Sequence, residues 1–202
     1  MNKSLKNITK DLKSSLDKDR YRHTLGVSNT AVCLAMKYEV NLEKAELAGL
    51  LHDCAKCIPD DKKLKKCIEH NISINDIEKQ QPYLLHSKLG AFIAMDKYGI
   101  QDKEIINAIL RHTTGSADMS MLDKIIFVAD YIEPNRKKAA NLTLIRKISF
   151  EDIDTAVYLI LRDTLEHLRK KGTIIDTQTQ KAYEFYKKIF DEKNKENSIK
   201  QK

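Results

Sequence analysis

The near-continuous helical spacing of apolar residues is the feature that most limits how this chain folds. Only six glycines and three prolines interrupt 202 residues, and the alternation of β-branched residues that predicts strands is nearly absent. The spacing predicts an all-α fold with helices at residues 3–16, 18–39, 42–55, 60–70, 74–79, 85–98, 102–112, 119–131, 141–147, 150–171 and 178–192. Asn41 precedes the third segment and is expected to cap it, and Asp152 and Asp154 favour the N-terminal end of the tenth.

The chain is long enough to bury one sizeable apolar core. No repeat, low-complexity block or linker divides it, so we expect a single domain over residues 1–192. Residues 193–202 are polar and are expected to form a disordered tail.

The formal net charge of +7 comes mainly from lysines on polar helix faces. A solvated lysine-rich surface accounts for this charge, and so does an anionic partner such as a phosphorylated substrate or a nucleic acid. Arginine is scarce, and no basic run is interleaved with aromatic residues, which disfavours the nucleic acid.

The sequence also indicates where the protein works. No apolar run approaches the roughly 18 residues that a membrane span needs, and the first residues lack the apolar stretch of a signal peptide. We therefore expect a cytoplasmic protein without membrane contact, in which the four cysteines stay reduced. Cys54 and Cys57 form one C-x-x-C pair without the second pair of a zinc finger, which favours a structural role. A homodimer is compatible with the sequence.

Titratable residues recur on the apolar faces of the expected helices, each near a helix end. His23, for example, lies with Val27, Ala31 and Leu34 at helical spacing. The full set is His23, His52, Asp53, His86, His112 and Asp130.

Burying these six groups separately would cost more free energy than burying them around a shared metal site. A buried carboxylate without a partner is expensive, whereas metal coordination uses neutral imidazole and ionised carboxylate directly. His52 and Asp53 are adjacent at the end of an apolar run, so they can flank one ion, and the two oxygens of Asp53 can bridge two. His70 and His167 lie in polar segments and are expected to be structural or surface residues.

His23, the pair His52-Asp53 and Asp130 resemble the H…HD…D pattern of the HD-domain superfamily of metal-dependent phosphohydrolases. The segments LLHSKLGAFIA and AILRHTTGSADMSMLDKIIFVADYIEPNR narrow the resemblance to the bacterial YqeK family. The resemblance implies an all-helical HD fold, with a metal-binding core at about residues 18–136 and C-terminal helices at about 141–192.

The resemblance also implies a centre of two transition metals, expected to be iron, with manganese, cobalt, nickel and zinc as alternatives. By position, Asp53 would bridge the two ions. One ion would be held with His23, His52 and Asp130, and the other with His86 and His112.

The activity that the resemblance implies is symmetrical hydrolysis of a nucleotide substrate, diadenosine tetraphosphate, to two ADP. Two metals together lower the pKa of a water and neutralise charge on the phosphate. Asp53, Lys56 and Arg136 are the expected catalytic residues. Substrate contacts are expected from His23, Lys56, Tyr83, Thr113, Asp130, Arg136 and Thr173.

Two alternatives remain open at this point. The first is an HD phosphohydrolase that acts on a different nucleotide. The second is a nucleotide-sensing or assembly factor that keeps the fold without turnover, although the presence of all six expected ligands disfavours it.

Overall fold

The computed structural model describes residues 4–200, with side chains described for residues 4–196. Regular structure within this range is helical throughout, which confirms the expected all-α fold. The elements are α1 (Leu5–Ser15), α2 (Lys18–Lys37), α3 (Leu42–Leu51), α4 (Asp60–Glu69), α5 (Asp76–Gln80), the 3₁₀ helix η1 (Pro82–Leu85), α6 (His86–Asp96), α7 (Lys103–Arg111), α8 (Met121–Ile132), α9 (Leu142–Ile148), α10 (Ile153–Lys170) and α11 (Thr177–Lys200).

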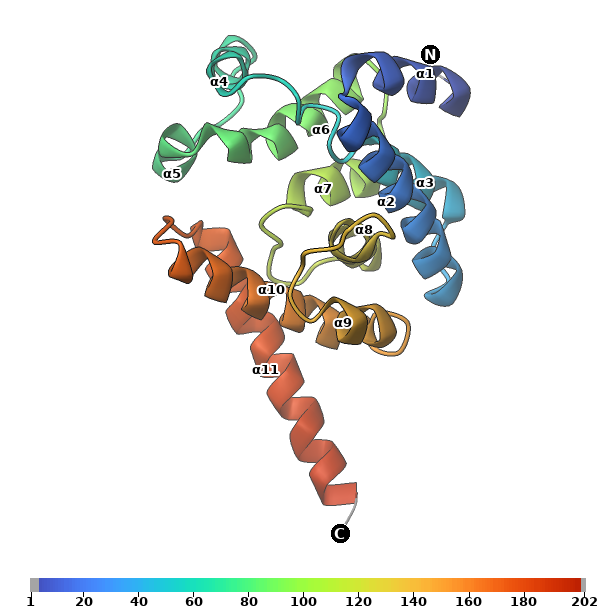
Figure 1. The fold of residues 1–202 in the computed structure, drawn as a ribbon, viewed down its shortest axis with the longest axis vertical. Helices are drawn as coiled ribbons and strands as arrows, with labels where there is room; N and C mark the ends of the chain where they lie inside the picture. The colour runs from blue at the N-terminus through green and yellow to red at the C-terminus, as the bar shows by residue number, and fades with distance from the viewer. Residues whose placement is uncertain (1–3, 201–202) are drawn as a thin grey trace.

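The core lies where α2, α3, α7, α8 and α10 meet. α2 packs against α3 and α8, and α7 packs against α3, α6 and α8 (Figure 1). Apolar side chains from these helices are buried together, among them Leu34, Leu51, Ile109, Ile126 and Leu161. Burial of these apolar side chains is the main contribution that holds the helices in fixed positions around the centre of the molecule.

Side-chain caps begin several helices where the sequence expects them. Asn41 accepts a hydrogen bond from the backbone N–H of Lys44 at 3.0 Å, at the start of α3. Asp152 accepts from the backbone N–H of Asp154 at 3.1 Å, at the start of α10. Each cap satisfies a backbone donor that the first helical turn leaves free.

The end of α3 differs from the prediction. The spacing predicts a helix over 42–55, but α3 ends at Leu51, and the following residues form consecutive turns. In these turns the backbone N–H of Cys54 donates to Leu51 O (3.1 Å) and that of Lys56 to Asp53 O (2.9 Å). Such three-residue hydrogen bonds tighten the chain. Asp53 is therefore freed from helical spacing relative to His52, and both side chains point inward.

The C-terminal helix α11 lies beside α10 and then projects away from the remaining helices (Figure 1). It continues to Lys200, past the expected end at 192, and residues 201–202 lie outside the described residues. The division into a domain and a disordered tail stays a prediction. Among the described helices, none has the length and apolar character that crossing a membrane requires.

Candidate metal centre

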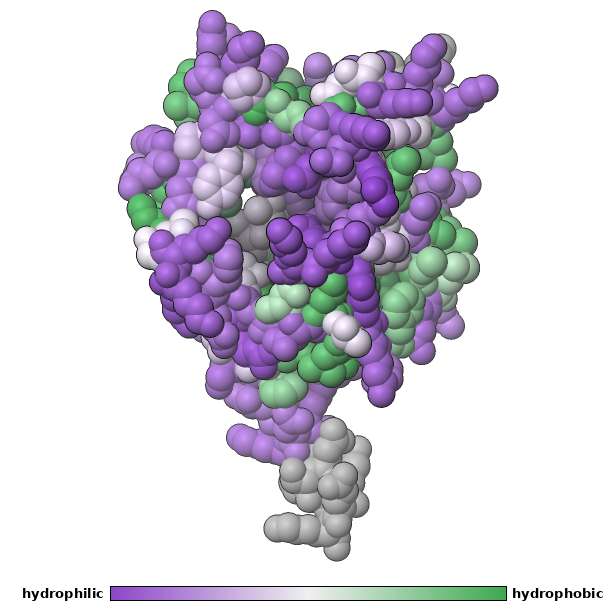
Figure 2. Space-filling model, in the orientation of Figure 1, coloured by the Kyte–Doolittle hydropathy of each residue, from purple (hydrophilic) through white to green (hydrophobic). Residues whose placement is uncertain are grey.

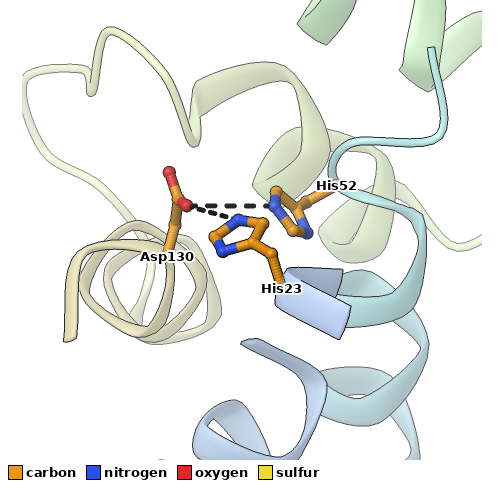
Figure 3. A group of neighbouring side chains, drawn as sticks. All are labelled: His23, His52 and Asp130. Atoms are coloured by element: carbon orange, nitrogen blue, oxygen red, sulfur yellow. Dashed lines mark ion pairs between the residues drawn. The ribbon is translucent and has the colours of Figure 1, made fainter. Parts of the chain in front are cut away.

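The residues expected as metal ligands meet at one place in the fold. They come from α2, α6, α8 and the residues that follow α3 and α7: His23, His52, Asp53, His86, His112 and Asp130. All except Asp130 are buried, and the side chain of Asp130 is 24% exposed. Figure 3 shows His23 and His52 directed toward Asp130 from different segments of the chain. Five separate parts of the sequence thus contribute to a single cluster.

One half of the cluster joins two histidines to two carboxylates. His23 Nε2 lies 3.0 Å from Asp130 Oδ1, and His52 Nε2 lies 4.0 Å from the same oxygen. Asp53 Oδ2 lies 3.8 Å from His23 Nε2 and 3.3 Å from His52 Nε2. Nitrogen and oxygen atoms from these four residues therefore face a common point.

The other half of the cluster is built around Asp53 Oδ1. His86 Nε2 and His112 Nε2 lie 3.1 Å apart, and Asp53 Oδ1 is 3.3 Å and 3.4 Å from them. The two oxygens of Asp53 therefore face different histidine pairs. A carboxylate in this position can bind two ions, one through each oxygen.

The outer ring nitrogens of the histidines have partners of their own. Each of His52, His86 and His112 has Nδ1 within 2.6–2.8 Å of the backbone carbonyl three residues earlier. A carbonyl only accepts, so each Nδ1 donates, and the lone pair lies on Nε2. Fixing the tautomer in this way orients a histidine for metal binding.

The chemistry of the cluster fits a pair of metal ions. Among the described residues, the buried side-chain atoms without a hydrogen-bond partner include His23 Nε2, His52 Nε2 and Asp53 Oδ1. Buried polar atoms are normally paired, so atoms without a partner in both halves of the cluster call for a ligand. His23, His52 and Asp130 could hold one ion, as could His52, Asp53 and His112. Imidazole with carboxylate suits iron, manganese, cobalt, nickel or zinc.

Electrostatics keep these groups in the states that metals bind. Burial alone would raise the pKa of Asp53, but the histidines that face its two oxygens hold it well below its usual value. Burial likewise opposes ionisation of Asp130, yet its pKa is lowered by His23, His52 and Arg136. Burial lowers the pKa of His86 to about 4, so its imidazole is neutral near neutral pH.

Two expected substrate residues lie beside the His86 half of the cluster. Lys56 Nζ is 3.1 Å from His86 Nε2 and 4.0 Å from Asp53 Oδ1. Thr113 Oγ1 is 3.0 Å from the Nε2 atoms of both His86 and His112. A cation and a hydroxyl group therefore border this half.

Arg136 borders the other half. Its Nη2 lies 2.8 Å from Asp130 Oδ1 and 2.9 Å from Asp130 O. The side chain thus pairs with Asp130, and it occupies a turn past the end of α8, as the proline in EPNR predicts.

The structure does not bring Tyr83 and Thr173 into this cluster. The Tyr83 hydroxyl donates to Gln81 Oε1 at 2.5 Å, and the ring is partly exposed. Thr173 lies in the loop after α10, and the amide of Gln81 donates to Ile174 O in the same loop at 2.9 Å. The two residues therefore flank a contact between η1 and this loop. His70 stacks on Phe92 and His167 is exposed, so both lie outside the cluster, as expected.

Sequence reasoning missed two residues that touch the cluster, Arg20 and Glu133. Arg20 Nη1 lies 2.6 Å from Asp53 Oδ2, and Glu133 Oε1 lies 3.1 Å from His23 Nδ1. The spacing held a signal for Arg20, which precedes His23 by three residues and so shares its helix face. Glu133 lies beyond the end of α8, where helical spacing no longer applies.

A cavity of about 650 Å³ opens beside His23. Five cationic residues and three acidic ones contribute to its lining: Arg20, Arg22, Arg136, Lys137, Lys138, Asp17, Asp19 and Glu133. A second cavity, of about 700 Å³, shares Arg136 and Lys137 with the first. Figure 2 shows a hollow near the centre of one face of the molecule, bordered mostly by hydrophilic side chains. The surface beside the cluster is thus suited to an anion longer than a single phosphate.

Comparison with known proteins agrees with this geometry. The family model for the HD domain matches residues 20–135, which include the whole cluster. This chain belongs to the HD domain family. The protein is a hydrolase of this family, and the resemblance to YqeK proteins is confirmed by relatives that match most of the chain.

Two curated relatives and one solved structure illustrate the similarity. The chain is 39% identical to a Halalkalibacterium halodurans protein named bis(5'-nucleosyl)-tetraphosphatase, symmetrical, over 85% of this chain and 91% of the relative. It is 36% identical, with the same coverage, to a Bacillus subtilis protein of that name. A crystal structure of a predicted HD superfamily hydrolase involved in NAD metabolism, from Clostridium acetobutylicum, superposes with a TM-score of 0.89. Its identity is 38%, over 92% of this chain and 98% of that one.

Proposed function

We propose that this HD-domain protein is a two-metal phosphohydrolase that cleaves diadenosine tetraphosphate symmetrically to two ADP. The observation that supports this most directly is the division of the two Asp53 oxygens between separate histidine pairs, beside a cation-lined cavity. The names of the Halalkalibacterium and Bacillus relatives support the choice of substrate.

The proposed ligands divide as the two halves of the cluster do. His23, His52 and Asp130 would hold one ion, His86 and His112 would hold the other, and Asp53 would bridge them. Two bound metal ions would lower the pKa of a water toward neutrality and neutralise charge on a phosphate. Iron is the proposed metal, with manganese, cobalt, nickel and zinc as alternatives.

The cationic residues would bind and orient the phosphates. Arg136 presents a planar fork of donors that suits two phosphate oxygens, and Arg20, which pairs with Asp53, lines the same cavity. Lys56 lies beside His86, where it would stabilise charge that develops on the departing ADP. Thr113 would donate a hydrogen bond on the same side.

Tyr83 and Thr173 flank the contact between η1 and the loop after α10, which makes them candidates for one nucleoside. A cytoplasmic location, the absence of membrane and nucleic-acid partners, and a homodimer remain predictions that accompany the proposed function.

The test is product analysis with a panel of nucleotides and the metal-loaded protein. Diadenosine tetraphosphate should give ADP alone, because the central phosphoanhydride bond lies between two equal halves of the substrate. ATP with AMP in the chromatogram would refute symmetrical cleavage. Faster hydrolysis of a mononucleotide or cyclic dinucleotide would favour a different HD phosphohydrolase, and binding without products would favour a sensor.

A further inference from the structure

Glu133 is a buried carboxylate that the proposed chemistry does not use. Its side chain is 2% exposed, and Oε1 lies 3.1 Å from His23 Nδ1. Its other oxygen, Oε2, accepts from the backbone N–H of Asn135 at 2.6 Å and from Asn135 Nδ2 at 3.0 Å. The carboxylate is therefore held in one orientation, with one oxygen toward His23 and the other toward Asn135.

This arrangement distinguishes His23 from the other three histidines of the cluster. Each of those donates Nδ1 to a backbone carbonyl three residues earlier, which is a neutral acceptor. His23 instead meets a carboxylate 110 residues away in sequence. A hydrogen bond to an ionised acceptor is roughly twice as strong as one between neutral groups, and it makes the opposite ring nitrogen a better donor to a metal.

The packing of α2 leaves room for this carboxylate. A Cβ atom added at Gly26 would lie 2.4 Å from Glu133 Oε2 and 3.1 Å from Asn135 Nδ2. The first of these contacts is far shorter than van der Waals separation, so a larger residue at this position would displace the carboxylate. The main chain of Glu133 is also held, because Arg146 Nη2 donates to its carbonyl at 2.9 Å.

We propose that Glu133 is a positioning residue that strengthens metal binding at the His23 half, so that the two metal positions retain their ions unequally. The inference rests on the ligands of the proposed function. The surroundings of the two halves also differ. At the His23 half, Arg20 and Arg136 each pair with a carboxylate oxygen, and Glu133 adds a further buried carboxylate. At the other half, the Lys56 cation lies 3.1 Å from His86 Nε2, a proposed ligand nitrogen. More negative charge near a cation strengthens its binding, and a nearby lysine weakens it.

The experiment measures metal retention under a graded chelator challenge, with metal content per chain determined by elemental analysis. The wild-type protein should lose its two ions in separate steps. Glu133→Gln keeps the shape of the side chain and removes its charge. The more tightly held ion should then be lost at a chelator concentration at least tenfold lower than in the wild type. Gly26→Ala, which displaces the carboxylate without removing it, should do the same. Glu151→Gln, at an exposed surface glutamate, should match the wild type.

Two variants, each with one half of the cluster disrupted, show which metal position Glu133 acts on. In His112→Ala, where the His23 half remains, Glu133→Gln should lower retention tenfold or more, and in His23→Ala it should change nothing. Circular dichroism of each metal-free variant checks the helical fold. Equal retention by Glu133→Gln and the wild type, or equal losses in both backgrounds, would overturn the inference. If the Glu133 inference fails but the protein still produces ADP, the proposed function stands. If the two ions are lost in separate steps as expected but no hydrolysis occurs, only the proposed function is refuted.

Discussion

At the scale of single residues, Asp53 organises the centre. Its Oδ2 faces His52 at 3.3 Å and Arg20 at 2.6 Å, while Oδ1 faces His86 at 3.3 Å. The surrounding histidines keep its pKa low despite burial, so it is ionised and can contribute both oxygens. This buried carboxylate is costly to replace, since loss of its charge would leave Arg20 without its ion-pair partner.

Arg136→Lys tests whether the arginine grips phosphate or only supports Asp130. Lysine keeps the charge and loses the fork, so kcat/KM should fall roughly ten- to a hundredfold, or about 1.4–2.7 kcal/mol, with Tm and metal content unchanged. Steady-state kinetics with elemental analysis provide the measurement. Arg169→Lys, at a solvent-facing position of α10, is the matched control and should be silent. Unchanged kinetics would show that Arg136 does not bind the substrate. A loss of metal would show that Arg136 instead supports Asp130 as a metal ligand.

At the scale of elements, the close approach of α2 and α3 brings His23 and His52 together. A Cβ at Gly49 would lie 2.7 Å from Ser28 Cα, which is backbone and cannot move aside. By contrast, a Cβ at Gly90 in α6 would have its nearest neighbour at 3.5 Å, an ordinary contact. Close packing of α3 on α2 therefore requires glycine at position 49, whereas the packing around position 90 has room for a methyl group.

Gly49→Ala should destabilise the fold by about 1–3 kcal/mol, because the added methyl group forces α3 away from α2. Gly90→Ala should be neutral or stabilising by up to about 1 kcal/mol, since alanine favours the helix and space is available. Urea denaturation of both variants makes the comparison. Equal effects from the two substitutions would contradict the packing argument.

A second element-scale prediction concerns the contact between the start of α10 and α11. Lys193 Nζ lies 2.8 Å from Asp152 Oδ1, and Asp152 also caps α10. Burial opposes ionisation of Asp152, but Lys193 and Thr155 lower its pKa below the usual value. A depressed folded-state pKa gives stability that is present above the unfolded pKa and is lost as pH falls through the folded value.

Asp152→Asn should therefore lower Tm at about pH 6, and the difference from the wild type should shrink toward about pH 3. The expected loss is at most about 1 kcal/mol, because the pair with Lys193 is partly exposed and asparagine can still cap α10. Thermal unfolding across this range measures it. Asp191→Asn, in the exposed pair with Lys187, should have a much smaller effect. A difference that does not depend on pH would contradict the assignment to the carboxylate.

At the scale of the whole molecule, the cluster joins helices that are far apart in sequence. α2, α3, α6, α7 and α8 each end or pass at the centre and contribute to it. Metals bound there would stabilise the folded state by mass action, since the unfolded chain does not present this set of ligands together.

Metal removal should accordingly lower Tm, and reconstitution should restore it with two ions per chain. At a free metal concentration of about 100 times Kd, each site would contribute about 2.7 kcal/mol. Elemental analysis combined with calorimetry provides the measurement. One ion or none per folded chain after reconstitution would contradict the two-metal centre.

Local sequence was sufficient for the helices and for the residues of the centre. Caps such as Asn41 and Asp152 act within one turn, and an inward-facing histidine such as His23 is recognisable from neighbours on its own helix. These features depend on interactions across three or four residues, so spacing alone carries them. Most helix positions and the inward direction of the histidines follow from such short-range rules, although the ends of α3 and α11 do not.

Only the tertiary structure decided which atoms of those residues meet. The early end of α3, the separate histidine pairs on the two Asp53 oxygens, and the contact of His23 with Glu133 depend on how helices pack. Arg20 reaches Asp53 across 33 residues, and Glu133 reaches His23 across 110. Distances of that kind are set by the burial of apolar faces between helices, which spacing along one helix does not encode.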